Sequence, residues 1–242
     1  MPSSLLPRHD PSPRAPVPLR TALLVWAGAW IAGQTVSSAI ALGSGHTSLS
    51  TAGPGWLLAV AVAGWVPMVL AVWMVGKRYG AGDLRSGFGL SFHLTDLWGV
   101  VLGVLTQLVV IRVVYLPLEA IWPDTFSQDR LEQRAREMYD SAAGAGVLLL
   151  VLVVVVGAPF VEELVYRGLL QGSAVRTGRR WPAVVAVAFF FAVIHFQPVE
   201  IPGLFVIGLV MGAAALLTGR LGLSVVTHMA FNATGLLVVA LS

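Results

Sequence analysis

The sequence predicts an all-α, polytopic membrane helix bundle with about seven transmembrane helices. Hydrophobic residues make up 57% of the 242 residues and charged residues only 11%, and the mean hydropathy is +0.82. Several apolar runs have roughly the 20 residues that a helix needs to cross about 30 Å of hydrocarbon. Because the chain is this apolar, we expect membrane lipids as its surroundings and no nucleic acid as a partner.

Seven apolar segments are candidate spans. They are residues 21–43, 56–76, 97–121, 145–175, 181–197, 201–218 and 222–241. The fifth and sixth are short and meet at a tight connection, so they form either a full hairpin or a partly re-entrant pair. A polar, helix-prone segment over 125–142 should lie on the extracytoplasmic membrane surface or extend the fourth span.

The chain divides into a tail and one transmembrane domain. Residues 1–19 are rich in Pro and Ser and lack the basic region and apolar core of a secretory signal, so we expect a flexible cytoplasmic tail. Residues 20–242 should form a single transmembrane domain, whose motif-bearing core covers about 145–241.

Basic residues are concentrated in alternate connections between the predicted spans. They cluster before the first predicted span and after the second, fourth and sixth. The connections at 44–55 and 198–200 contain no Lys or Arg, and the one at 122–144 balances three Arg with five acidic residues. This alternation predicts a cytoplasmic N-terminus and an extracytoplasmic C-terminus. The richness in Ala, Val, Gly and Arg favours a bacterial inner membrane.

Polar residues interrupt three of the apolar spans. The fourth contains Glu162, Glu163 and Arg167, the fifth contains His195, and the seventh contains His228 and Asn232. A charged side chain at the bilayer centre costs roughly 2.5–3.5 kcal/mol on insertion scales, and such residues usually face a bundle interior or a wet cavity. These residues therefore predict a buried reactive site.

Helical spacing assigns different faces to the two glutamates. Adjacent residues lie about 100° apart around a helix, so Glu162 and Glu163 cannot share one face. Glu163 and Arg167 are four residues apart and can form a supporting ion pair, which leaves Glu162 free for chemistry. A carboxylate beside a histidine can deprotonate water, and a second histidine with an amide can stabilise an oxyanion.

Counting along straight helices does not place the three candidate site residues at the same depth in the membrane. At 1.5 Å per residue, Glu162 and His195 each lie about 21 Å from the cytoplasmic end of their span, but His228 lies only about 12 Å from its own. Helix tilt or a kink at Pro159 must close this gap if the site is to form.

The three motifs resemble those of a known family. Glu162-Glu163-x-x-x-Arg167, Phe191-x-x-x-His195 and His228-x-x-x-Asn232 are similar to the motifs of the CPBP (CAAX protease and bacteriocin-processing, or Abi) intramembrane proteases, which include the type II CAAX prenyl endopeptidases. The resemblance covers about residues 150–235.

The resemblance implies a role for each motif residue. Glu162 and His195 would activate the attacking water, while His228 and Asn232 would stabilise the oxyanion. Glu163 and Arg167 would support this machinery. Two aromatic neighbours, Tyr166 and Phe191, are packing residues or line the substrate cavity.

The need for a cofactor has two readings. We favour direct activation of water with no cofactor. In the alternative, Glu162, His195 and His228 form a His₂Glu zinc set, which is an adequate number of catalytic ligands. The chain lacks the H-E-x-x-H pattern that places two histidines on one helical turn.

The expected function is that of an intramembrane endopeptidase acting on a membrane-associated or lipidated peptide or protein. The sequence leaves open whether that substrate is prenylated. One alternative is a non-catalytic membrane scaffold or a bacteriocin-immunity-type protein. Another is a proton-coupled transporter, which the lack of an internal repeat disfavours.

Overall fold

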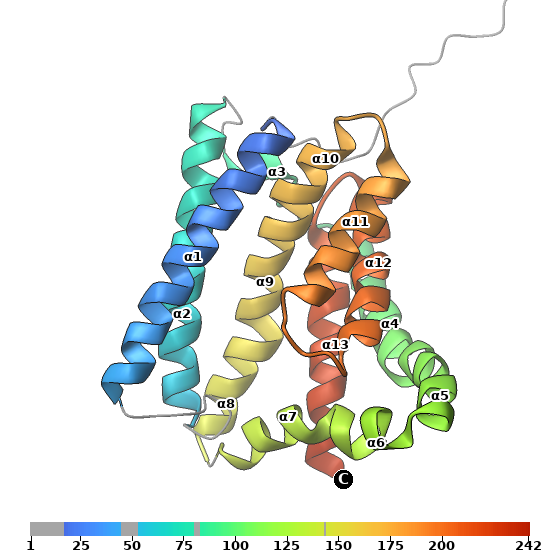
Figure 1. Cartoon of the computed structure of the whole chain (residues 1–242). Helices are drawn as coiled ribbons and strands as arrows, with labels where there is room; N and C mark the ends of the chain where they lie inside the picture. The colour runs from blue at the N-terminus through green and yellow to red at the C-terminus, as the bar shows by residue number, and fades with distance from the viewer. Residues whose placement is uncertain (1–16, 45–52, 80–82, 143) are drawn as a thin grey trace, which may run out of the picture.

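The structure, a computed structural model, describes residues 17–44, 53–79, 83–142 and 144–242, so most of the predicted tail lies outside it. Within these ranges every regular element is a helix. Six helices are long and apolar enough to cross a membrane, and Figure 1 shows them side by side in one bundle. They are Leu19–Gly43, Pro54–Arg78, Leu94–Ile121, Gly146–Val175, Ile201–Thr218 and Gly222–Leu241. The predicted polytopic helix bundle is confirmed.

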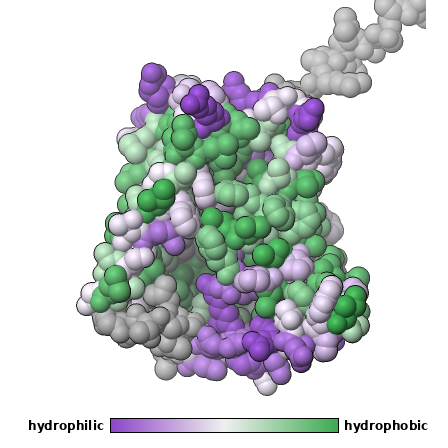
Figure 2. All heavy atoms as spheres, viewed as in Figure 1, coloured by the Kyte–Doolittle hydropathy of each residue, from purple (hydrophilic) through white to green (hydrophobic). Residues whose placement is uncertain are grey.

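The outer surface of the bundle is apolar. Large hydrophobic side chains such as Leu24, Ile31 and Leu108 are exposed. Figure 2 shows a hydrophobic band between two hydrophilic ends. Contiguous exposed apolar surface of this kind marks contact with a membrane or partner, and the chain is an integral membrane protein.

The first two spans form an antiparallel hairpin beside the fourth. They are α1 (Leu19–Ser44) and α2 (Pro54–Arg78). Their backbones approach closely, since a Cβ on Gly33 would lie 3.0 Å from the carbonyl oxygen of Gly64. α2 also packs on the fourth span, where a Cβ on Gly157 would lie 2.4 Å from the ring of Trp65. Glycine is needed at such contacts because a side chain would push the helices apart.

The third span packs against the last one. The chain reaches it through α3 (Leu84–Phe88) and η1 (Leu94–Leu97), and the span itself consists of α4 (Trp98–Leu105), the π-helical segment η2 (Thr106–Val110) and α5 (Ile111–Ile121). A Cβ on Gly103 would lie 2.4 Å from the carbonyl oxygen of Thr227. The third span is therefore in backbone contact with the helix that carries His228.

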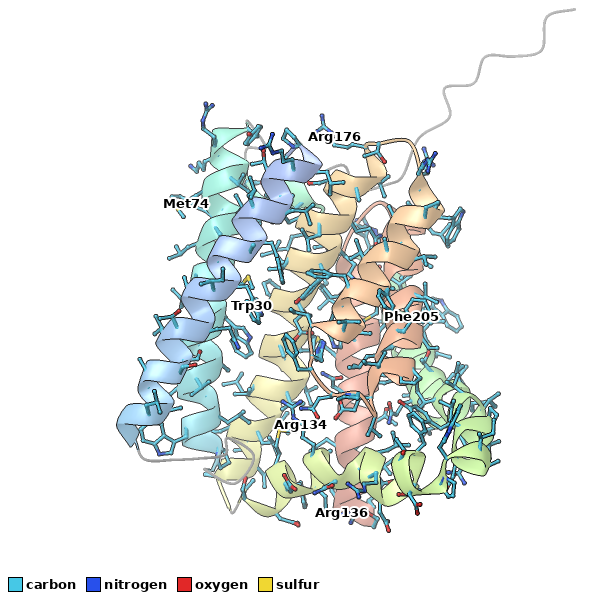
Figure 3. The ribbon with its side chains drawn as sticks, in the orientation of Figure 1. Trp30, Met74, Arg134, Arg136, Arg176 and Phe205 are labelled. Atoms are coloured by element: carbon cyan, nitrogen blue, oxygen red, sulfur yellow. The ribbon has the colours of Figure 1, made fainter. Side chains whose placement is uncertain are left out.

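Two short polar helices cross one end of the bundle. They are α6 (Pro123–Phe126) and α7 (Gln128–Asp140). Figure 1 shows α7 lying across the end where the chain terminates, which agrees with the predicted polar helix over 125–142. In Figure 3, Arg134 points from α7 toward the bundle and Arg136 points away from it.

The fourth span runs through the centre of the bundle and contains two π-helical segments. It consists of α8 (Gly146–Val151), the π-helical η3 (Leu152–Gly157), α9 (Ala158–Glu162), the π-helical η4 (Glu163–Gln171) and α10 (Gly172–Val175). All nine residues of η4 are buried. π-Helical turns are rare and occur frequently at functional sites. Here one of them begins at Glu163, within the first motif.

The fifth predicted span, 181–197, is helical over only part of its length. The helix α11 (Arg180–Val193) has 14 residues, which gives a length of about 21 Å. Figure 1 shows that it ends part-way along α9 and continues as a loop. Phe196 takes a left-handed backbone conformation with φ of 53°, which a helix cannot continue through. His195 therefore lies in the turn that follows α11.

The last two spans complete the core. They are α12 (Ile201–Thr218) and α13 (Gly222–Leu241). α12 approaches the fourth span at Gly208 and Gly212, whose carbonyl oxygens accept hydrogen bonds from Arg167 at 3.2 Å and from Gln171 at 2.8 Å. These polar contacts between helices fix the position of η4 against α12.

Candidate active site

Glu163 is the centre of a buried polar network. Its side chain is fully buried, and its Oε1 accepts hydrogen bonds from Arg167 Nη1 and His228 Nδ1, each at 3.0 Å. Its Oε2 accepts a hydrogen bond from the Ser224 hydroxyl. A buried charge is stable only when it is paired and hydrogen-bonded. Four groups from two helices thus hold one another in place.

Arg167 is fixed on every side. It is fully buried, its second terminal nitrogen donates to the Gly208 carbonyl, and its guanidinium carbon lies 4.4 Å from the centre of the Phe191 ring. The stacking adds a cation–π attraction, which strengthens when the pair is shielded from water. The Nε of Arg167 is buried without a hydrogen-bond partner among the described residues. Arg167 therefore supports Glu163 from a position that is closed to solvent.

Glu162 lies next to His228. Its Oε2 is 3.8 Å from His228 Nε2, and its side chain is 24% exposed whereas that of His228 is 6% exposed. His228 therefore contacts both glutamates, one through each ring nitrogen. The gap of several ångströms that straight helices leave between Glu162 and His228 is closed in the bundle.

His195 is oriented by its own turn. Its Nδ1 lies 2.6 Å from the carbonyl oxygen of Phe191. Since a carbonyl can only accept, Nδ1 carries the proton and Nε2 is left as the acceptor when the ring is neutral. Among the described residues no hydrogen bond or ion pair joins His195 to Glu162. The two residues expected to share a water are thus not in direct contact in the described part of the chain.

Phe191 lies between the two histidines. Its ring centre is 4.6 Å from that of His195, 6.0 Å from that of His228 and 5.2 Å from that of Tyr166. Phe191 and Tyr166 are both buried. Both aromatic residues therefore form the apolar wall of the polar network.

Asn232 lies one turn after His228 on α13. Its amide nitrogen donates a hydrogen bond of 2.8 Å to the carbonyl oxygen of Val154, in the π-helical η3. The amide nitrogen carries two hydrogens, so one donor is still available after this contact. The contact ties the oxyanion candidate to the fourth span.

Ser224 is a site residue that the sequence reasoning missed. Ser224, His228 and Asn232 are spaced four residues apart on α13, so they share one helix face. That spacing is the signal that could have found it. Its hydroxyl donates a hydrogen bond to Glu163 Oε2, whereas Arg167 and His228 both donate to Oε1.

The described residues contain no group of three His, Asp or Glu side chains arranged to hold a metal ion. Glu162, His195 and His228, the alternative zinc set, are therefore not assembled as ligands in this arrangement. The groups that are assembled form an ionic and hydrogen-bonded network.

Comparison with known proteins gives one match. Residues 144–234 match a family described as Type II CAAX prenyl endopeptidase Rce1-like. The searches of curated proteins and of solved structures found no match. The matched segment contains all three motifs and begins after α7, so the first three spans lie outside it. Residues 144–234, which carry every predicted site residue, are thus similar to the type II CAAX prenyl endopeptidase Rce1-like family.

Proposed function

We propose that this protein is an intramembrane endopeptidase that hydrolyses a peptide bond of a membrane-associated or lipidated peptide or protein. The family supports a CAAX-type intramembrane protease in general terms. The observation that carries the proposal is the approach of Glu162 to within 3.8 Å of His228, whose other nitrogen is held by the buried Glu163. A partly exposed carboxylate beside a fixed imidazole is a suitable arrangement for proton transfer.

In the proposed reaction, a water molecule attacks the carbonyl carbon of the scissile bond. The Glu162 carboxylate takes the proton of this water, and the unprotonated Nε2 of His195 accepts the second hydrogen bond. The tetrahedral intermediate carries one negative charge on oxygen. It collapses as the C–N bond breaks, and the proton held by Glu162 passes to the leaving amine. No covalent enzyme intermediate is required.

The oxyanion would be stabilised from α13. A protonated His228 can donate Nδ1–H to Glu163 and Nε2–H to the oxyanion, and Asn232 has one amide hydrogen to spare. Donors that are fixed before the reaction stabilise developing charge at little reorganisation cost. Glu163, Arg167 and Ser224 would supply that fixation.

The test is cleavage of a panel of labelled membrane peptides, with and without a lipid anchor, by the purified protein in liposomes. We expect Glu162→Gln to lower kcat/KM by about 10²–10⁴-fold, the range that a general base contributes. Glu137→Gln, a change of the same kind on α7, is the matched control and should cleave as the wild type does. Equal cleavage by Glu162→Gln and the wild type would remove the catalytic assignment and favour a scaffold.

The same assay decides the cofactor question. In the favoured reading, activity survives prolonged dialysis against a chelator. Loss of activity on dialysis and its recovery with added zinc would instead establish a metalloprotease, with Glu162, His195 and His228 as the first ligands to test.

A further inference from the structure

We propose that Tyr115 is a positioning residue for His195, and this rests on the proposed role of His195 in catalysis. Tyr115 lies on α5, outside the segment that matches the family. It acts through the connection between α11 and α12, and it does not touch the reacting groups.

One hydroxyl group joins the end of this connection to the first turn of α12. The Tyr115 hydroxyl donates a hydrogen bond of 2.7 Å to the Val199 carbonyl and accepts one of 3.1 Å from the Gly203 N–H. Gly203 lies in the first turn of α12, where backbone N–H groups have no partner within the helix. The Tyr115 side chain is only 3% exposed, so no water competes readily for these bonds. Tyr115 therefore supplies a partner that the helix itself cannot.

The close fit of Tyr115 against α12 depends on glycine. A Cβ on Gly203 would lie 3.2 Å from both Cε2 and the hydroxyl oxygen of Tyr115. Any larger residue would press on the ring and shift the hydroxyl. The absence of a side chain at Gly203 thus leaves the space that the tyrosine ring occupies.

The connection carries His195 at its other end. His195 is held by the Phe191 carbonyl, and the next residue, Phe196, has the left-handed φ of 53°. A strained non-glycine conformation persists only where the surrounding structure holds it. Only three residues separate Phe196 from Glu200, so a displaced Val199 would relax the turn that aims His195.

The connection also carries a charge that acts on the site. Glu200 interacts electrostatically with His195 and with Arg134 of α7. Movement of the connection would therefore change the position of His195 relative to the other site residues. A displacement of about 1 Å at a catalytic group can cost roughly 10²-fold in rate.

The first test is amide hydrogen exchange of the full-length protein in lipid, comparing the wild type with Tyr115→Phe and Tyr79→Phe. Tyr79 is the matched control, because its hydroxyl contacts Thr21 between α1 and α2. We expect Tyr115→Phe to speed exchange at least tenfold in residues 195–203 and to leave α13 unchanged. Unaltered exchange over 195–203 would overturn the anchoring role, and this result does not depend on protease activity.

The second test asks whether Tyr115 acts through His195. Tyr115→Phe should lower kcat about tenfold or more with little change in KM, and Tyr79→Phe should not. In a His195→Ala background, Tyr115→Phe should have no further effect on kcat, since its target is gone. The same fold loss in both backgrounds would show a general structural role and overturn the proposal. Absence of cleavage by the wild type would instead contradict the proposed function itself.

Discussion

At the scale of single residues, the ionised groups of this protein are stabilised by one another. Glu163 is bonded to Arg167, His228 and Ser224, so its charge is compensated within the bundle. Removing one partner of such a buried pair typically costs about 3–5 kcal/mol, because the other charge is left uncompensated. Within the described residues, Glu162 has one ionic neighbour, His228, and its side chain is 24% exposed. This contrast separates the support residue from the residue we assign to chemistry.

Glu200 gives a prediction for pH. Burial raises the pKa of its carboxyl above the usual value of 4.5, while the charges of Arg134 and His195 act in the lowering direction. A carboxyl whose pKa is raised by folding contributes stability below its unfolded pKa and loses it as pH rises through the folded pKa. We expect Glu200→Gln to remove the loss of stability that the wild type shows as pH rises above about 4.5.

Thermal unfolding in detergent across pH 4 to 8 measures this difference. Glu137→Gln is the control and should follow the wild-type profile. If the stability of Glu200→Gln and of the wild type changed with pH in the same way, folding would not raise the pKa of Glu200.

At the scale of elements, glycine decides how closely the helices approach. Gly103 on α4 faces the backbone of α13, while Gly28 on α1 has nothing within 4 Å of an added Cβ. Backbone atoms cannot rotate away as a flexible side chain can. The pair of glycines therefore separates an effect of packing from an effect of helix propensity.

We expect Gly103→Ala to lower the free energy of unfolding by about 1–3 kcal/mol, as overpacking does. It should also reduce cleavage, because the displaced α13 carries His228 and Asn232. Gly28→Ala should be neutral or slightly stabilising, since alanine favours a helix over glycine by about 1 kcal/mol. Chemical unfolding in lipid bicelles measures both variants. Equal stabilities would show that α4 and α13 tolerate a wider separation.

The fifth span shows where hydropathy misleads at this scale. Its apolar run continues through His195, yet the helix stops at Val193. Periodicity cannot detect the left-handed turn at Phe196, because a change of backbone conformation at one residue leaves the apolar pattern of the sequence unaltered. The helix α11 is shorter than the predicted span, and the non-helical connection after it completes the passage toward the end of the bundle where α7 lies (Figure 1).

At the scale of the whole molecule, the two ends of the bundle differ in their balance of basic and acidic residues. The end at which α1 begins carries Arg176, and the opposite end carries Arg134 and Arg136 on α7 (Figure 3). The basic residues at the first end have few acidic neighbours in sequence, whereas those on α7 are balanced. From the positive-inside rule we predict that the first end faces the cytoplasm.

Single-cysteine labelling can test this orientation without background, since the chain contains no cysteine. In intact bacterial spheroplasts, a membrane-impermeant maleimide should label Arg130→Cys on α7 and leave Arg179→Cys unlabelled. Both should react after permeabilisation. The reverse labelling would invert the proposed topology and place the C-terminus in the cytoplasm.

The sequence by itself determined the class of protein, the spans other than the fifth, and the residues that form the motifs. These follow from local composition and from spacing along one helix, as for Glu163 with Arg167. Only the tertiary structure decided that His228 bridges the two glutamates, that Ser224 completes the network and that Tyr115 holds the connection after His195. These contacts join residues 65, 61 and 88 positions apart. They depend on helix tilt, on π-helical turns and on close glycine contacts, which no local pattern of residues encodes.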